Sequence, residues 1–200
     1  MYKPFELLSP IHFLIVLLCV LLIVYLPRLF LHRGKQFERQ LRLSLVFLIL
    51  TFQVFDFYKV VYLFGEHWKT ALPFHLCDFS ALSIAAYLLT SKKYFFNFAF
   101  FWGISGAGMA ILTPNAVLGF PSVDYLANQY GHTLILLSIS TAMVVFNQRP
   151  YIKDIFTIFG FTTLLLPLVY GLNYILQAPA NYWYLLVKPI GSNIMTPLPE

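Results

Sequence analysis

Charged residues are scarce in this chain. Asp, Glu, Lys and Arg make up 10% of its 200 residues, whereas soluble domains contain about a quarter. Hydrophobic residues supply 60% of the chain and aromatic residues 18%. This composition excludes an ordinary soluble domain and predicts a membrane protein whose rings serve lipid-facing surfaces and helix packing.

Cysteine is also nearly absent, because only Cys19 and Cys77 occur. Two cysteines do not make a disulfide framework, and Cys19, inside an apolar run, is typical of a small hydrophobic residue. No CxxC or HxxxH spacing indicates a metal site. A zinc site built from His75, Cys77, His132 and a carboxylate stays a minor alternative. We therefore expect neither a metal nor a cofactor.

Long apolar segments dominate the rest of the chain. A helix needs about 20 predominantly apolar residues to cross a bilayer. Six segments approach this length, at 10–31, 41–64, 74–90, 94–112, 130–146 and 152–176. They predict an all-α fold, a polytopic transmembrane helical bundle of six spans that forms one integral membrane domain over residues 1–200. Residues 181–187 (NYWYLLV) are too few to span, so we expect this segment to be interfacial or re-entrant.

The basic residues indicate an orientation. The first, third and fifth connections carry nine of them, namely Arg28, Arg33, Lys35, Arg39, Arg42, Lys92, Lys93, Arg149 and Lys153. The opposite side has three, namely Lys3, Lys69 and Lys188. Cytoplasmic loops are enriched in Lys and Arg, so we expect a multi-pass protein of the cell membrane with an extracytoplasmic N-terminus. The net charge of +5 then reflects topology and gives no reason to expect nucleic acid.

Polar residues gather toward the outer ends of these spans. They are Asp56, Lys59, His75, Cys77, Asp78, His132 and Asn173. Ionisable groups within a membrane are costly and usually mark a site or a pathway. Asp56 and Lys59, at i and i+3, can form an ion pair that lowers this cost. That pair suits helix packing as well as catalysis.

The stretch PFHLCD opens the third span. On a helix, His75 and Cys77 point apart, whereas His75 and Asp78 can meet. Pro73 suits a helix start, so Cys77 lies at a helix N-terminus, where exposed N–H groups favour a thiolate. Alternatively, Cys77 is a buried small residue and His75 a helix cap.

A second histidine strengthens the catalytic interpretation. His132, in YGHT, begins the fifth span, and an antiparallel bundle can bring it to Cys77. A thiol beside an imidazole is an activated nucleophile, because the base removes the thiol proton and the thiolate attacks a carbonyl carbon. Asp78, Asp56 or Asn173 could orient the imidazole.

Several motifs together resemble one family. LPFHLCDFSAL, the LTPN turn, YGH and the terminal GLNY and NYWYLLVKP resemble the YwaF-like bacterial integral membrane proteins, which are related to the transmembrane protein 164 acyltransferases. The resemblance implies a helical bundle and acyl transfer through a cysteine thioester, with Cys77 as nucleophile and His132 as its partner. Family members continue into a further helix after the KP segment. This chain ends in PLPE, so we expect a seventh span to be absent from it.

The first functional hypothesis is a membrane-embedded acyltransferase or transacylase that acts on lipids at the outer leaflet. Its partners are membrane lipids, a phospholipid acyl donor and a lipid acceptor. Cys77, His132 and His75 would be catalytic, with His75 as a positioning group or second acid and base. The substrate-binding or orienting residues would be Asp78, Asp56, Lys59, Asn173, Asn181 and Tyr184. The alternative is a small-solute or proton-coupled transporter or binding protein with a polar cavity, and a third possibility is a structural subunit without a site.

Overall fold

The structure is a computed structural model that describes residues 3–7 and 9–188. Within them the chain is helical, and its only strand-like pairing is an isolated bridge between Pro4 and Leu118. The expectation about a seventh span concerns residues 189–200, which lie outside the described residues. The elements are α1 (Pro10–Tyr25), η1 (Leu26–Phe30), α2 (Lys35–Tyr58), η2 (Lys59–Leu63), η3 (Trp68–Thr70), α3 (Leu76–Thr90), α4 (Lys93–Trp102), η4 (Gly103–Ala107), α5 (Gly108–Leu112), α6 (Val123–Val144), α7 (Ile152–Leu176) and η5 (Tyr182–Tyr184).

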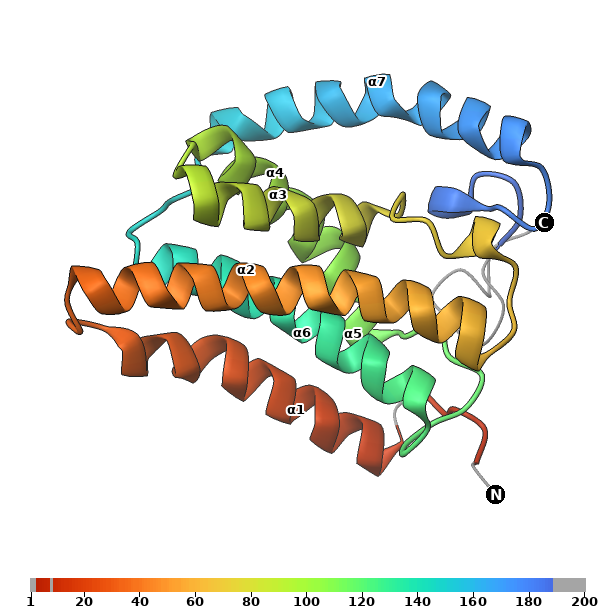
Figure 1. Ribbon diagram of the computed structural model, residues 1–200, viewed down its shortest axis with the longest axis horizontal. Helices are drawn as coiled ribbons and strands as arrows, with labels where there is room; N and C mark the ends of the chain where they lie inside the picture. Colours follow the sequence, from red (N-terminus) through yellow and green to blue (C-terminus); the bar gives the residue numbers. More distant parts are fainter. Residues whose placement is uncertain (1–2, 8, 189–200) are drawn as a thin grey trace.

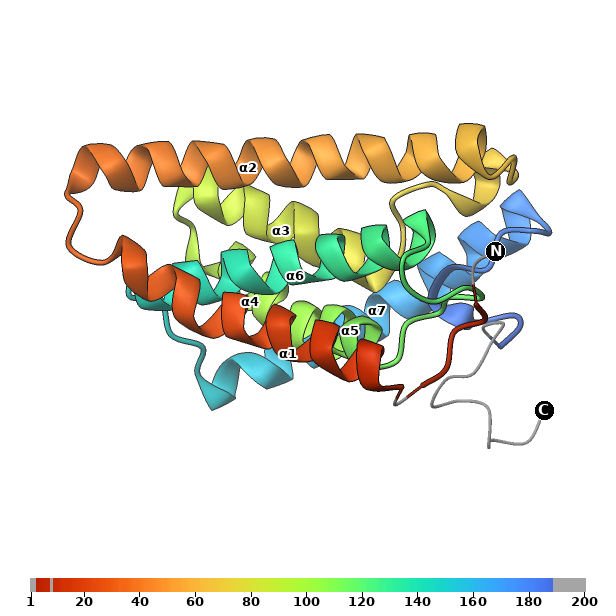
Figure 2. The ribbon, with the colours of Figure 1, turned by 90° about the horizontal axis from the view of Figure 1, so that it is seen from below.

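The long helices run side by side. Figure 1 shows α7 along one edge of the bundle and α1 along the opposite edge, with α2 and α3 between them. The view from below in Figure 2 shows α2 on one side of the bundle and α6 farther inside. Helix α3 packs against α4 and α2, and α1 packs against α6. The core therefore lies among α2, α3, α4 and α6, where Ile84, Tyr87, Phe96 and Ile139 are buried.

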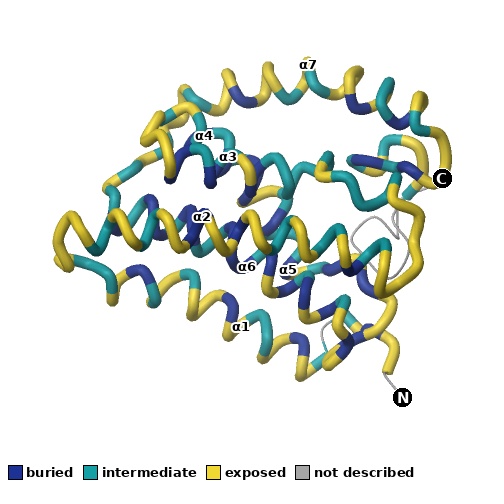
Figure 3. Tube along the Cα trace, viewed as in Figure 1, coloured by how far each residue is buried: buried dark blue, intermediate teal, exposed yellow. Residues whose placement is uncertain are grey.

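The outer surface of the bundle is apolar. Figure 3 shows exposed positions along α1, α2 and α7, and they include Phe13, Val54 and Phe156, the last of which is 75% exposed. In the described chain, four segments are long and apolar enough to cross a membrane, namely Pro10–Phe30, Lys35–Leu63, Lys93–Leu112 and Ile152–Leu176. So large an apolar surface suits lipid rather than water. The all-α fold and the membrane character predicted from the sequence are confirmed.

Two of the six expected spans are helical but differ from these four. Helix α3 has 15 residues, fewer than a bilayer crossing usually needs. Helix α6 has 22 residues, but Asp124, Asn128, Gln129 and His132 lower the mean hydropathy of its first half.

Helix α6 begins at Val123, earlier than the start expected at residue 130. The Ser122 side chain accepts a hydrogen bond from Tyr125 N at 3.3 Å, which caps the helix, and Asp124 lies in its positive first turn. The extra turns carry Asp124 and Asn128 into the bundle. Both therefore belong to the helix that presents His132.

Close packing of α2 and α6 depends on Gly131, because a Cβ there would lie 2.2 Å from Phe52 Cε1. We expect Gly131→Ala to lower the free energy of unfolding by about 1–3 kcal/mol, the usual cost of overpacking. Thermal unfolding in detergent measures this change. Gly160→Ala on α7 is the control, since its Cβ would meet nothing within 4 Å. Equal stability of the two variants would contradict the prediction.

Candidate functional site

A cavity of about 350 Å³ lies between α2, the segment before α3 and the first turn of α3. Four of the predicted site residues line it, namely Asp56, His75, Cys77 and Asp78. The remaining lining residues are Gln53, Val54, Phe57, Thr70, Ala71, Leu72 and Pro73. The structure thus brings the HLCD stretch and the Asp56 carboxylate of α2 to the same cavity.

Cys77 lies in the first turn of α3. The backbone N–H groups of Cys77 and Asp78 lie beside its sulfur, and the Asp78 N–H donates a hydrogen bond to His75 O at 3.0 Å. The π-helical turn η4 passes beside this helix start, and the Cβ position of Gly106 lies 3.6 Å from Cys77 N. Such turns are frequent at functional sites. Asp56 and Asp78 also place negative charge near the sulfur, so removal of the thiol proton requires a base.

Asp78 fixes the start of α3. Its Oδ2 accepts a hydrogen bond from His75 N at 2.9 Å, which is the carboxylate half of a capping box. Its Oδ1 accepts a hydrogen bond from Gln53 Nε2 of α2 at 3.2 Å. The i, i+3 meeting predicted for His75 and Asp78 therefore occurs through the His75 backbone. Since both oxygens are engaged, Asp78 acts as a positioning group.

Lys59 connects α2 to α6 beside the cavity. It is 5% exposed, and its Nζ lies 2.8 Å from Asp56 Oδ1 and 3.2 Å from Asp124 Oδ1. The ion pair predicted from the i, i+3 spacing is present, and a second carboxylate from α6 completes it. Asp124 is not among the residues predicted for the site, because hydropathy predicts a helix start at residue 130 and leaves residue 124 in a loop. Pairing lowers the cost of a lysine among membrane helices.

Aromatic rings pack around His75. The ring centroids of His75 and Tyr182 lie 4.9 Å apart, and those of His75 and Tyr184 lie 5.8 Å apart. Trp183 Nε1 donates a hydrogen bond to Phe74 O at 2.8 Å. The segment 181–187 therefore folds back onto the residues that precede α3.

Asn173 of α7 anchors this segment. Its Oδ1 accepts a hydrogen bond from Tyr182 N at 2.8 Å, and its Nδ2 donates one to Tyr182 O at 2.9 Å. The Tyr182 hydroxyl donates to Lys69 O and accepts from Leu72 N at 3.0 Å. Asn173 is buried. Its role is therefore to hold the aromatic segment against the cavity wall.

The two other predicted residues in this segment differ in role. Asn181 shapes the local turn, since its Oδ1 accepts a hydrogen bond from Leu186 N at 3.1 Å. The Tyr184 hydroxyl accepts one from Asn115 Nδ2 at 3.2 Å. Trp183 and Tyr184 have φ angles of 57° and 53°, which are unusual for aromatic residues. Of the two predicted residues Asn181 and Tyr184, Tyr184 is the one whose side chain packs against His75.

The tyrosines near the cavity are not bases at neutral pH. Burial raises the pKa of Tyr182 to about 12. Burial likewise raises the pKa of Tyr184. Both phenols therefore remain protonated, so the groups near the thiol that can accept a proton are the imidazoles and the carboxylates of Asp56 and Asp78.

His132 lies on α6 and does not line the cavity. Its Nδ1 lies 2.7 Å from Asn128 O. A carbonyl oxygen can only accept, so Nδ1 carries the proton and Nε2 keeps its lone pair. His132 lies within electrostatic range of both Asp56 and Lys59, so the ring lies near the ion pair at the edge of the cavity. No hydrogen bond between His132 and Cys77 occurs in the described structure, and their contact stays a prediction.

The described residues contain no group of three or more His, Cys, Asp or Glu side chains able to hold a metal ion. Another histidine, His12, is buried and was not predicted as a site residue. Its Nδ1 lies 2.7 Å from the Tyr125 hydroxyl and its Nε2 lies 3.0 Å from Leu112 O. Because both nitrogens are engaged, His12 joins helices and offers no free base.

The Asn173 anchor can be tested separately. We expect Asn173→Ala to lower the free energy of unfolding by about 1–3 kcal/mol, because two backbone groups of Tyr182 lose their partners. Proteolysis within residues 178–188 should also become faster. Tyr174→Ala, at a neighbouring position that is 77% exposed, is the control and should change neither measurement. Equal proteolysis rates in both variants would show that Asn173 does not anchor the segment.

A family model described as the TMEM164 family matches residues 4–200. The chain belongs to the TMEM164 family. This membership confirms the relationship predicted from the HLC and NYWYLLVKP motifs, and it makes the four apolar helices those of a membrane protein family.

One relative of this TMEM164 family member is an uncharacterized protein of Treponema pallidum (strain Nichols). It is 34% identical over 98 residues, which are 49% of this chain and 38% of that protein. The alignment thus spans less than half of the relative's length. No solved structure matches the chain.

Proposed function

We propose that this TMEM164 family member is an acyltransferase or transacylase that acts on membrane lipids through a thioester on Cys77. One observation carries the proposal: Cys77 lies in the first turn of α3 and lines a cavity among membrane helices. Asp56, Asp78 and His75 line the same cavity. A thiol that shares a largely apolar cavity with three ionisable side chains suits attack on the ester carbonyl of a lipid.

The proposed topology has six crossings of the cell membrane, with α3 and α6 as the shorter and the more polar crossings. The excess of Lys and Arg on the connections after the first, third and fifth spans supports an extracytoplasmic N-terminus. The start of α3 then lies toward the outer leaflet. A phospholipid is the natural acyl donor at that depth, since cytosolic thioesters do not reach it.

The reaction proceeds in two halves. His132 Nε2 removes the Cys77 proton, and the thiolate forms a bond to the donor's ester carbonyl carbon. The bond from that carbon to the alcohol oxygen breaks, and the imidazolium returns its proton to the leaving lysolipid. A lipid hydroxyl then attacks the thioester, transfers its proton to the imidazole, and leaves with the acyl group as the thiol re-forms. N–H groups at the start of α3 stabilise the oxyanion in each half, and His75 positions the substrate.

Mass spectrometry of the intact protein tests this function. After incubation with a phospholipid and no acceptor, we expect a mass increase equal to one acyl chain, located on Cys77 and removed by hydroxylamine. Addition of a lysolipid should discharge it. An adduct on another residue, or none under conditions that support transfer, would contradict the thioester mechanism.

The second candidate function is a transporter or binding protein. The observation that favours it is the buried Lys59 between Asp56 and Asp124, because paired charges among membrane helices often lie on ion or proton pathways. Such a protein would depend on Asp56 and would tolerate replacement of Cys77.

A further inference from the structure

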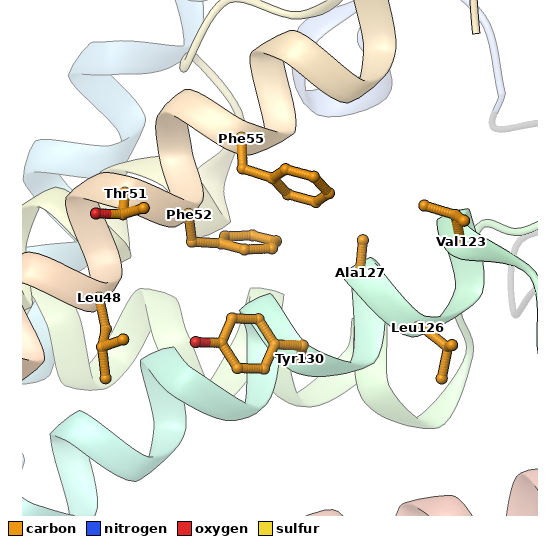
Figure 4. Close-up of a pocket in the computed structure, with 8 residues that line it drawn as sticks. All are labelled: Leu48, Thr51, Phe52, Phe55, Val123, Leu126, Ala127 and Tyr130. Atoms are coloured by element: carbon orange, nitrogen blue, oxygen red, sulfur yellow. The ribbon is translucent and has the colours of Figure 1, made fainter. Parts of the chain in front are cut away.

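A second opening, of about 450 Å³, lies between α2 and α6. On α2 its wall is formed by Leu48, Thr51, Phe52 and Phe55, which are spaced as one face of a helix. Figure 4 shows the Phe52 and Phe55 rings extending from α2 toward α6. The lining is almost wholly apolar, so water has few partners there.

Helix α6 supplies the opposite wall with the same spacing, through Val123, Leu126, Ala127 and Tyr130. Two apolar faces of this kind normally interlock. Here Ala127 is too small to fill the space between them, and a groove remains (Figure 4). The Tyr130 and Phe52 rings, with centroids 5.4 Å apart, close part of its length.

The groove ends beside charged residues. On α2, Phe55 is followed by Asp56, and on α6, Val123 is followed by Asp124. Lys59 joins both carboxylates across the two helices. The opening is therefore apolar along its length and charged at one end. Helix α2 belongs to a segment able to cross a membrane. The groove is therefore apolar where a lipid has its acyl chain and charged where a lipid has its ester and headgroup.

We propose that the α2–α6 groove binds one acyl chain of a membrane phospholipid, with the ester toward Lys59 and Asp56. This inference rests on the proposed function for its role as a substrate site. Asp56 lines the Cys77 cavity from the same helix. A chain in the groove thus presents its ester at the same end of α2 as the Cys77 cavity, which lies on another face of that helix.

Photocrosslinking tests the groove without requiring turnover. The full chain, carrying Cys77→Ala, is placed in phosphatidylcholine vesicles that contain phosphatidylcholine with a diazirine on one acyl chain. We expect labelled peptides that include residues 48–55 or 123–130. Ala127→Phe should lower this labelling at least about tenfold, since displacing two methylene groups is enough for that change. Thr51→Trp, at an exposed position on the other wall, should do the same.

The matched control is Ala86→Phe. It adds the same volume in another apolar groove, of about 420 Å³, between α3, α4 and α7. Labelling of the α2 and α6 peptides should not change in this variant. The inference is overturned if labelling of these peptides falls equally in all variants or stays unchanged in both groove variants. It is also overturned if the crosslinks lie mainly between two copies of the chain. Thioester formation in the wild type without groove labelling would overturn the groove alone, whereas groove labelling without any thioester would overturn the proposed function alone.

Discussion

Replacement of Cys77 by Ala is expected to lower acyl transfer at least about 10⁴-fold, as removal of a catalytic nucleophile typically does. The reason is that Cys77 carries the only thiol among the described residues that line the cavity, and the proposed mechanism passes the acyl chain through its thioester. Transfer from a labelled phospholipid to a lysolipid in reconstituted vesicles measures the loss. Cys19→Ala is the matched control, because Cys19 is buried in α1 and does not line the cavity. It should retain full transfer.

A comparison of Cys77→Ala with Asp56→Asn separates the enzyme from the transporter. Under the proposed mechanism, Asp56→Asn weakens transfer only by disturbing the Lys59 network, so its loss is far smaller than that of Cys77→Ala. In a transporter, Asp56→Asn would lower uptake far more than Cys77→Ala. If neither variant affects transfer or uptake, both proposed functions fail and a structural subunit is the remaining interpretation.

Local spacing predicted two contacts within the candidate site correctly. Asp56 and Lys59 were expected to pair from their i, i+3 positions, and they do. Asp78 was expected to meet His75, and its carboxylate binds the His75 N–H. These contacts lie within one helical turn, where backbone geometry alone sets which residues meet. The helical fold was predictable for a similar reason, since long apolar segments have few other stable forms in a membrane.

Contacts between distant segments were not predictable in this way. Asp124 was missed because hydropathy placed the α6 start at residue 130, although Asp124, Asn128 and His132 recur at i, i+4 and i+8, a helical signal among polar residues. The bond from Asn173 to Tyr182 depends on how the chain turns after α7. The position of Gly106 against Cys77 depends on the π-helical turn η4. No residue pattern predicts either geometry.

The identity of the base gives the second large effect. We expect His132→Ala to slow thioester formation by about 10²- to 10⁴-fold, the usual contribution of a general base. Its Nδ1 bond to Asn128 O leaves Nε2 ready to accept the thiol proton, and contacts that are loose before substrate binds can tighten in the complex. Rapid-quench measurement of thioester formation gives this rate. Added imidazole should restore part of it, since a small base can enter the space that the ring vacated.

His75→Gln distinguishes a base from a positioning group. His75 lines the cavity and packs against Tyr182 and Tyr184, so its loss should raise KM more than it lowers kcat. His32→Ala, at an exposed position between α1 and α2, controls for loss of a histidine and should leave the rate unchanged. If His75→Gln instead slows thioester formation more than His132→Ala does, and imidazole restores only the His75 variant, then His75 is the base. Cys77 would remain the nucleophile at the start of α3, but its proton would pass to His75 in the cavity wall and not to His132 on α6.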